Sequence, residues 1–116
     1  MAAPAVDWIL KRQLRLELLC HPGPRFAVTK KYLARATGAK PREIEEAIHQ
    51  LRADGVPIGS GGNGYFMAES PEQLDGTVRH LTSRIRKETA TLRHTLSMQE
   101  RMKRPPADPN GQRRFA

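Results

Sequence analysis

Apolar residues recur along the chain with the spacing of helices that bury one face. Between Asp7, which can cap a helix, and Leu19 the leucines fall four residues apart, and this spacing predicts a first helix with one buried face. The expected buried residues are Leu10, Leu14 and Leu18, in a stripe widened by Ile9, Leu16 and Leu19. The prolines and glycine at positions 22–24 end this helix, because proline has no backbone N–H to donate.

Two further helices with a short turn between them are predicted next. Thr29 can cap a helix that runs to Thr37, and Gly38 favours the left-handed conformation that ends helices. Pro41 suits the first position of the following helix, which Gly55 ends. The buried face of that helix is predicted from apolar residues at i, i+3, i+4 and i+7, namely Ile44, Ala47, Ile48 and Leu51.

A glycine-rich reversal follows, in the segment DGVPIGSGGNGYFM. Two short apolar runs, at 56–58 and 65–67, flank a stretch that contains four of the nine glycines. This pattern predicts an antiparallel hairpin whose glycines allow positive φ and a close approach of the backbone to another surface. Because a lone hairpin is marginally stable, residues 26–28 are predicted to add a third strand.

A long fourth helix is predicted from Ser70 to Pro105. The sequence SPEQ at its start is that of a capping box with proline at the first position. Its apolar positions step by four, three, four and seven residues, with Glu88 at the missing heptad position, and they are Leu74, Val78, Leu81, Ile85 and Leu92. We expect the first two to pack on the strand at 65–67 and the last two to meet a second copy, which predicts a weak homodimer through residues 74–92.

The predicted fold class is mainly α with a small antiparallel β-hairpin (α+β). Its expected parts are a winged helix-turn-helix in residues 1–69, a long basic amphipathic helix in residues 70–104, and a disordered, proline-rich tail in residues 105–116.

Charge points to an anionic partner. The chain of 116 residues has 20 Lys and Arg against 12 Asp and Glu, a net charge of +8. This excess favours nucleic acid first, and an acidic protein or a membrane surface next. Residues 71–104 hold eight of the basic and four of the acidic residues. These cations either follow phosphates or solvate the surface of a coiled coil, and the sequence leaves both alternatives open.

The exposed face of the third helix is predicted to read base edges in the major groove. Lys40 and Arg42 lie at its amino-terminal end and are the first expected contacts. The acids on this helix are unfavourable near phosphates, and their alternative role is to pair with neighbours on a solvated face. Asn63 is the polar side chain at the hairpin tip, which has no cation. The full predicted DNA-binding set is Lys30, Lys31, Arg35, Lys40, Arg42, Glu45, Glu46, His49, Arg52 and Asn63.

Residues 33–67, LARATGAKPREIEEAIHQLRADGVPIGSGGNGYFM, resemble the winged helix-turn-helix at the amino terminus of bacterial biotin repressors. The leucine-alanine pair at 33–34 matches the start of the second helix, and Gly38 matches the turn. The strand GVPI at 55–58 and the closing GYF at 64–66 match the wing. The continuation AESPEQL into a basic helix is similar to small helix-turn-helix proteins of bacteriophages and prophages.

The resemblance implies binding of double-stranded DNA by a small transcriptional regulator of the kind that phages encode. The alternative is a protein-interaction module, such as a DNA-recognition subunit of a phage packaging or replication complex, that oligomerises through its long helix. The resemblance does not extend to the biotin-binding or ligase domains, so no enzymatic activity is expected.

Little in the sequence indicates catalysis or a cofactor. The four histidines are scattered, and GSGGNG lacks the G-K-[ST] ending of a phosphate loop. No metal, cofactor or small-molecule substrate is predicted. The single cysteine, Cys20, is expected to be a buried thiol in a reducing cytoplasm. No apolar run reaches the 18 residues of a membrane span, and MAAPAVDW is not a signal peptide.

Overall fold

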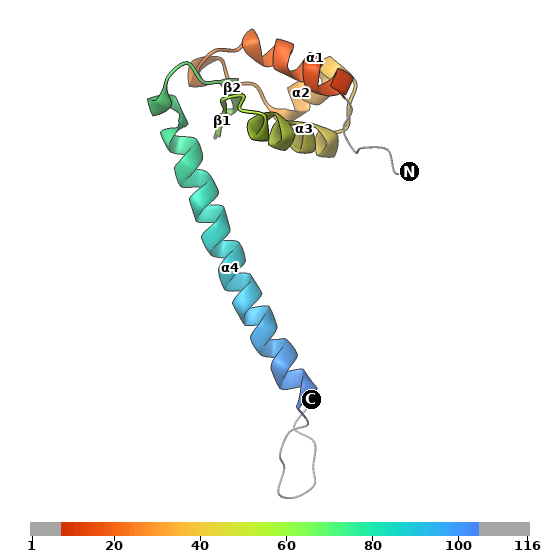
Figure 1. Cartoon of the computed structure of the whole chain (residues 1–116), viewed down its shortest axis with the longest axis vertical. Coiled ribbons are helices and arrows are strands. Elements are labelled where there is room, and N and C mark those ends of the chain that lie inside the picture. Colours follow the sequence, from red (N-terminus) through yellow and green to blue (C-terminus); the bar gives the residue numbers. More distant parts are fainter. Residues whose placement is uncertain (1–7, 105–116) are drawn as a thin grey trace, which may run out of the picture. The chain divides into compact units, whose positions relative to one another are not determined.

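The structure is a computed structural model that describes residues 8–104. It is mainly helical, with one two-stranded antiparallel sheet and a long C-terminal helix, as predicted (Figure 1). The elements are α1 (Trp8–Leu19), η1 (Pro24–Phe26), α2 (Lys30–Thr37), α3 (Pro41–Ala53), β1 (Ile58–Gly61), β2 (Gly64–Met67), η2 (Pro71–Leu74) and α4 (Asp75–Lys103). The chain divides into two compact units after His80. The predicted Asp7 cap and the predicted tail at 105–116 lie outside the described residues.

The core of the first unit lies between α1, α2, α3 and the hairpin, which Figure 1 shows gathered together. All four apolar residues predicted for the buried face of the third helix are buried in α3. They pack with Leu14, Leu18, Leu33, Ile58 and Met67. The 3.6-residue period of α3 therefore identified its core-facing side correctly.

The predicted widening of the stripe on the first helix is wrong. Leu14 and Leu18 are fully buried and Leu10 packs against the core, but Ile9, Leu16 and Leu19 are exposed. At about 100° per residue these three project from the side of α1 that is opposite Leu14. Cys20, expected to be buried, is also exposed, and its Sγ donates to the Leu16 carbonyl oxygen at 3.7 Å.

The hairpin forms at the predicted place, but the predicted third strand does not. β1 pairs antiparallel with β2, with Ile58 opposite Met67. In place of a continuous strand at 26–28, two isolated bridges cover the outer edge of β2, one at Pro22 and one at Val28. The interruption is the turn η1, in which the backbone N–H groups of Phe26 and Ala27 donate to the carbonyl oxygens of Gly23 and Pro24 and not to a strand. The sheet edge is nevertheless satisfied, because the backbone of Val28 exchanges hydrogen bonds of 2.8 and 2.7 Å with Tyr65.

The start of the long helix differs from the predicted capping box. Residues 71–74 form the 3₁₀ turn η2, and Ser70 makes no side-chain cap. The Gln73 side chain accepts a hydrogen bond from the backbone N–H of Glu69 at 2.7 Å, one residue earlier than a capping box requires. The α-helix proper therefore begins at Asp75, and it runs without interruption to Lys103.

The apolar stripe of α4 is mostly open to solvent. Leu74 and Leu81 are half-buried, whereas Val78, Ile85 and Leu92 are 59%, 64% and 58% exposed. The expectation that Val78 packs on β2 is therefore wrong. Thr77 is the buried residue of α4, because its hydroxyl bonds the hairpin.

Candidate nucleic-acid interface

The turn between α2 and α3 fixes the amino-terminal end of α3. Thr29 caps α2 by accepting a hydrogen bond from the Tyr32 backbone N–H at 3.0 Å. Gly38 ends this helix with φ of 78°, a left-handed conformation that glycine adopts without the steric cost of a side chain. The backbone N–H of Lys40 donates to Glu43 Oε1 at 2.8 Å, and Pro41 begins α3. This geometry leaves Lys40 and Arg42 exposed at the helix start.

The outward face of α3 is the predicted one. Arg42, Glu45, Glu46 and His49 are all exposed, on the side of the helix away from the buried Ile44 and its neighbours. Lys31 and Arg35 are exposed on α2. Within residues 8–104, the side chains of Lys31, Arg35 and Arg42 make no hydrogen bond or ion pair with the protein, so their cationic groups are available to an anionic ligand.

The acids of α3 have partners within the protein. Glu45 forms an ion pair with Lys30 of α2, which ties the two helices together. Glu46 accepts a hydrogen bond from Gln50 at 3.3 Å, and Glu43 holds the helix start. Lys30 and Glu45 were predicted as separate DNA contacts, whereas in the structure their side chains pair with each other. Their pairing lowers the repulsion that a free carboxylate would exert on phosphates.

Arg52 is directed to the hairpin. Its Nε donates to the Ile58 carbonyl oxygen at 2.9 Å and its Nη2 donates to Ser60 Oγ at 3.2 Å. The guanidinium thus fastens the C-terminal end of α3 to β1. Arg52 was predicted as a DNA contact, and this geometry gives it a supporting role for the hairpin.

A second side chain, Thr77 at the start of α4, also holds the hairpin. The Thr77 hydroxyl accepts from the Ser60 backbone N–H at 2.8 Å and donates to the Ser60 carbonyl oxygen at 3.0 Å. One side chain therefore satisfies both backbone groups on the outer edge of β1. No signal in the sequence predicted this contact, since a threonine in a helix is ordinary.

The glycines of the hairpin divide into two kinds. A side chain at Gly59 would collide with the ring of Phe66, with Cβ 2.2 Å from its Cζ, and one at Gly64 would lie 2.1 Å from the Val28 carbonyl oxygen. Gly61 and Gly62 have no atom within 4 Å of such a Cβ. Packing within the protein therefore requires glycine at positions 59 and 64. The other two leave the tip, with the exposed Asn63, open to an external surface.

Comparisons with protein-family models, with curated proteins and with solved structures find no match to this chain. The resemblance to the biotin-repressor type therefore rests on the motif in residues 33–67, and it stays a prediction. Within residues 8–104, no helix combines the length and apolarity that crossing a membrane requires. In the same range, no group of three or more His, Cys, Asp or Glu side chains is arranged to hold a metal ion.

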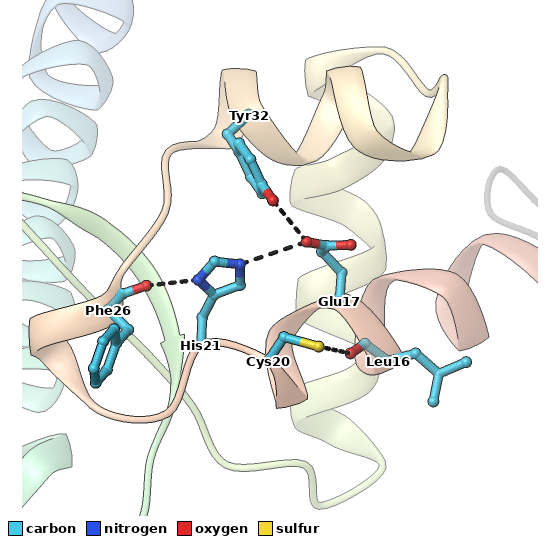
Figure 2. Close-up of polar contacts among 6 residues, drawn as sticks. All are labelled: Leu16, Glu17, Cys20, His21, Phe26 and Tyr32. Atoms are coloured by element: carbon cyan, nitrogen blue, oxygen red, sulfur yellow. Dashed lines mark hydrogen bonds and ion pairs between the residues drawn. The ribbon is translucent and has the colours of Figure 1, made fainter.

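A polar cluster that the sequence did not predict joins α1 to α2 (Figure 2). The Tyr32 hydroxyl donates to Glu17 Oε2 at 2.8 Å, and His21 Nε2 lies 3.4 Å from the same oxygen. His21 Nδ1 lies 2.9 Å from the Phe26 carbonyl oxygen, which can only accept. The imidazole and the Tyr32 ring are edge to face, with centroids 5.5 Å apart. The cluster fixes α2 against the C-terminal end of α1. Since α3 packs in one core with both helices, this contact also helps to position α3.

The cluster has a measurable signature at Tyr32. The hydrogen bond to the Glu17 carboxylate raises the pKa of Tyr32 above its ordinary value of 10.0, because ionisation would remove the donated proton. The neutral form is favoured in the folded protein, so this contribution to stability is present below about pH 10 and is lost as pH rises through the folded pKa.

We expect Glu17→Gln to lower the titration midpoint of Tyr32, measured by phenolate absorbance in a Tyr65→Phe background that removes the other tyrosine. Glu46→Gln is the matched control, because it removes an exposed carboxylate that does not bond Tyr32. An equal midpoint in the two variants would show that Glu17 does not hold the hydroxyl in solution.

Proposed function

We propose that this protein binds double-stranded DNA through a winged helix-turn-helix and is a small transcriptional regulator of the phage-encoded type. In this proposal α3 is the recognition helix, α2 crosses the backbone, and the hairpin is the wing. The observation that carries the proposal is the exposed, unpaired Arg42 beside Lys40 at the start of a helix whose other face is buried. A helix N-terminus with two cations suits phosphate and the edges of guanine.

The contacts of α3 and α2 divide the proposed site by role. Lys31 and Arg35 would meet phosphates, while Arg42 and His49 face the bases. Asn63 and the open backbone at Gly61 and Gly62 would contact phosphate from the wing. Lys30 and Arg52 act indirectly, since the first neutralises Glu45 and the second holds β1. The proposal includes a weak homodimer through residues 74–92, which sets the distance between two half-sites.

Selection of bound duplexes from a random DNA pool tests this function. We expect a recurring sequence to be enriched, and its affinity to fall steeply with salt because each neutralised phosphate releases counterions. Charge reversal of Lys40→Glu with Arg42→Glu should lower affinity for the selected duplex at least tenfold. Loss of the Lys40 contact with phosphate should lower the salt slope by roughly 0.9, and loss of Arg42 should remove a contact with the bases.

The matched control is Arg12→Glu with Arg25→Glu, an equal change of charge at exposed positions on α1 and η1. This control reports the effect of net charge alone. An absence of binding to duplex DNA at low salt, or equal losses in the two variants, would contradict the proposed role of α3.

A second candidate function, a protein-docking module, is supported by the outer face of α1. Trp8, Leu16 and Leu19 are each more than half exposed and lie on one side of this helix. Exposed apolar patches of this kind occur at protein interaction sites. A docking module keeps its protein partner when Lys40 and Arg42 are reversed, whereas a regulator loses its DNA.

A further inference from the structure

Four cations form a regular face on the second unit of the chain. Arg86 and Arg93 are seven residues apart in α4, and Lys87 and Arg101 lie on the neighbouring row, fourteen residues apart with His94 midway. At 3.6 residues per turn the two rows lie roughly 100° and 200° around the helix axis from the row of Ile85 and Leu92. We call Arg86, Lys87, Arg93 and Arg101 the basic face.

The basic face is not neutralised by the protein. From residue 89 to residue 99 the helix has no acidic residue. In residues 81–104, Lys103 pairs with Glu100 at 3.7 Å, whereas the four cations of the basic face enter no ion pair and are exposed. A helix surface that serves only as a solvated face is commonly stabilised by acid–base pairs four residues apart. The absence of such pairs here leaves the positive charge available to an external polyanion.

We infer that the basic face is a second surface for the phosphate backbone of duplex DNA, separate from the face of α3. Residues seven apart in a row are separated by roughly 10.5 Å along the axis, at 1.5 Å per residue. Cations at this spacing can therefore contact different phosphates of the same duplex. Three of the four cations are arginines, whose planar guanidinium groups bind phosphate oxygens in pairs. Small residues at 83, 90 and 97 separate them, so each long side chain stands clear of its neighbours.

The inference rests on the proposed function for the identity of the polyanion, and not for the surface itself. Basic helices that lie in an anionic lipid surface have a broad apolar face beside the cations. In α4 the apolar stripe is narrow and contains Glu88 between Ile85 and Leu92. This charge pattern favours nucleic acid over lipid. The surface adds affinity without sequence preference, because it meets phosphates and not bases.

The test measures binding of the full-length protein to a labelled random-sequence duplex by fluorescence anisotropy, at several salt concentrations. The variant is Arg86→Gln, Lys87→Gln and Arg93→Gln. If all three contact phosphates, the slope of log affinity against log salt falls by roughly 2.7. The affinity near 0.1 M salt then falls by at least tenfold. The control is Arg12→Gln, Arg25→Gln and Lys103→Gln, which removes equal charge elsewhere and should change the slope by less than one phosphate contact, about 0.9.

Each outcome decides the inference. If the slope of log affinity against log salt is the same in the two triple variants, the inference is overturned. The proposed function is then tested separately by the affinity of the Lys40→Glu, Arg42→Glu variant for the selected duplex. A lower slope in the basic-face variant supports the inference even if no sequence is enriched from the random pool. Binding of the wild type to vesicles of anionic phospholipid, without binding to the duplex, overturns both and assigns the basic face to a membrane surface. Circular dichroism must show equal helicity in both variants.

Discussion

Replacement of Gly64 by alanine is expected to lower the free energy of unfolding by about 3 kcal/mol or more. Gly64 has φ of 113°, a conformation that costs an L-residue about 1–3 kcal/mol. The added Cβ would lie 2.1 Å from the Val28 carbonyl oxygen and 2.9 Å from the Thr29 nitrogen. These are backbone atoms, so relief requires the strand edge to move apart. The two hydrogen bonds between Val28 and Tyr65 are then lost, at about 1 kcal/mol each.

Thermal unfolding followed by circular dichroism measures this loss, with Gly62→Ala as the matched control. Gly62 lies in the same hairpin, its φ is not positive, and a Cβ there meets no atom within 4 Å. We expect the Gly64 variant to melt lower by on the order of 10–25 °C, since 1 kcal/mol corresponds to roughly 4–8 °C in a domain of this size. The Gly62 variant should melt close to the wild type. Equal midpoints would mean that the close approach at Gly64 does not exist in solution.

The sequence pattern was sufficient to predict features that depend only on residues close together in the chain. The cap at Thr29, the left-handed Gly38 and the buried face of α3 each depend on residues close together in the sequence, and all three are confirmed. The hairpin was predicted for a similar reason, since its glycines and the two apolar runs are adjacent. Such features are set by backbone sterics and helix period, which the sequence states directly.

Contacts between distant segments could not be predicted in this way. The sequence shows that Arg52 is basic and that Thr77 is small and polar, but not that both reach Ser60. The pairing of Lys30 with Glu45 depends in the same way on how α2 and α3 pack. Leu16 and Leu19 of α1 are exposed, although the prediction places them on the buried stripe. An apolar side chain on a helix therefore need not lie on the buried face. Which side chains meet across the fold depends on how the elements pack together. The spacing of apolar residues along the sequence does not carry this information.

Substitution of Ile85→Asp with Leu92→Asp is expected to abolish the proposed homodimer. Both side chains are more than half exposed in the single chain, although they lie on the same side of α4 as the half-buried Leu81. A long helix is stabilised mainly by packing an apolar face, so this stripe is best satisfied by the same stripe of a second copy. Ile85 stands at one of the two seam positions of the heptad and Leu81 at the other, a combination that favours a two-stranded coiled coil. Glu88 in the seam keeps the association weak.

Sedimentation over a range of concentrations measures the association. Two carboxylates placed in the seam should raise the dissociation constant by on the order of a hundredfold or more, because each unpaired buried charge costs several kcal/mol. The control is Ser83→Asp with Ala90→Asp, which adds the same charges to the side of α4 away from the seam. A wild type that stays monomeric at high micromolar concentration would rule out the dimer.

The two double variants also separate the faces of α4 by function. The carboxylates introduced by Ser83→Asp and Ala90→Asp would lie among the cations of the basic face. The control that keeps the dimer should therefore weaken binding to random duplex, because it partly neutralises that face. The seam variant adds its charges away from the basic face, so it should retain most of this non-specific affinity as a monomer.

The loss in the seam variant should instead appear with a duplex that carries two half-sites. Two linked recognition helices gain affinity through a high effective concentration, and a monomer has no such gain. Fluorescence anisotropy with duplexes of one and two half-sites measures this difference for the wild type and for Ile85→Asp with Leu92→Asp. If the seam variant binds the two duplexes with the same affinity ratio as the wild type, α4 does not couple two copies on DNA.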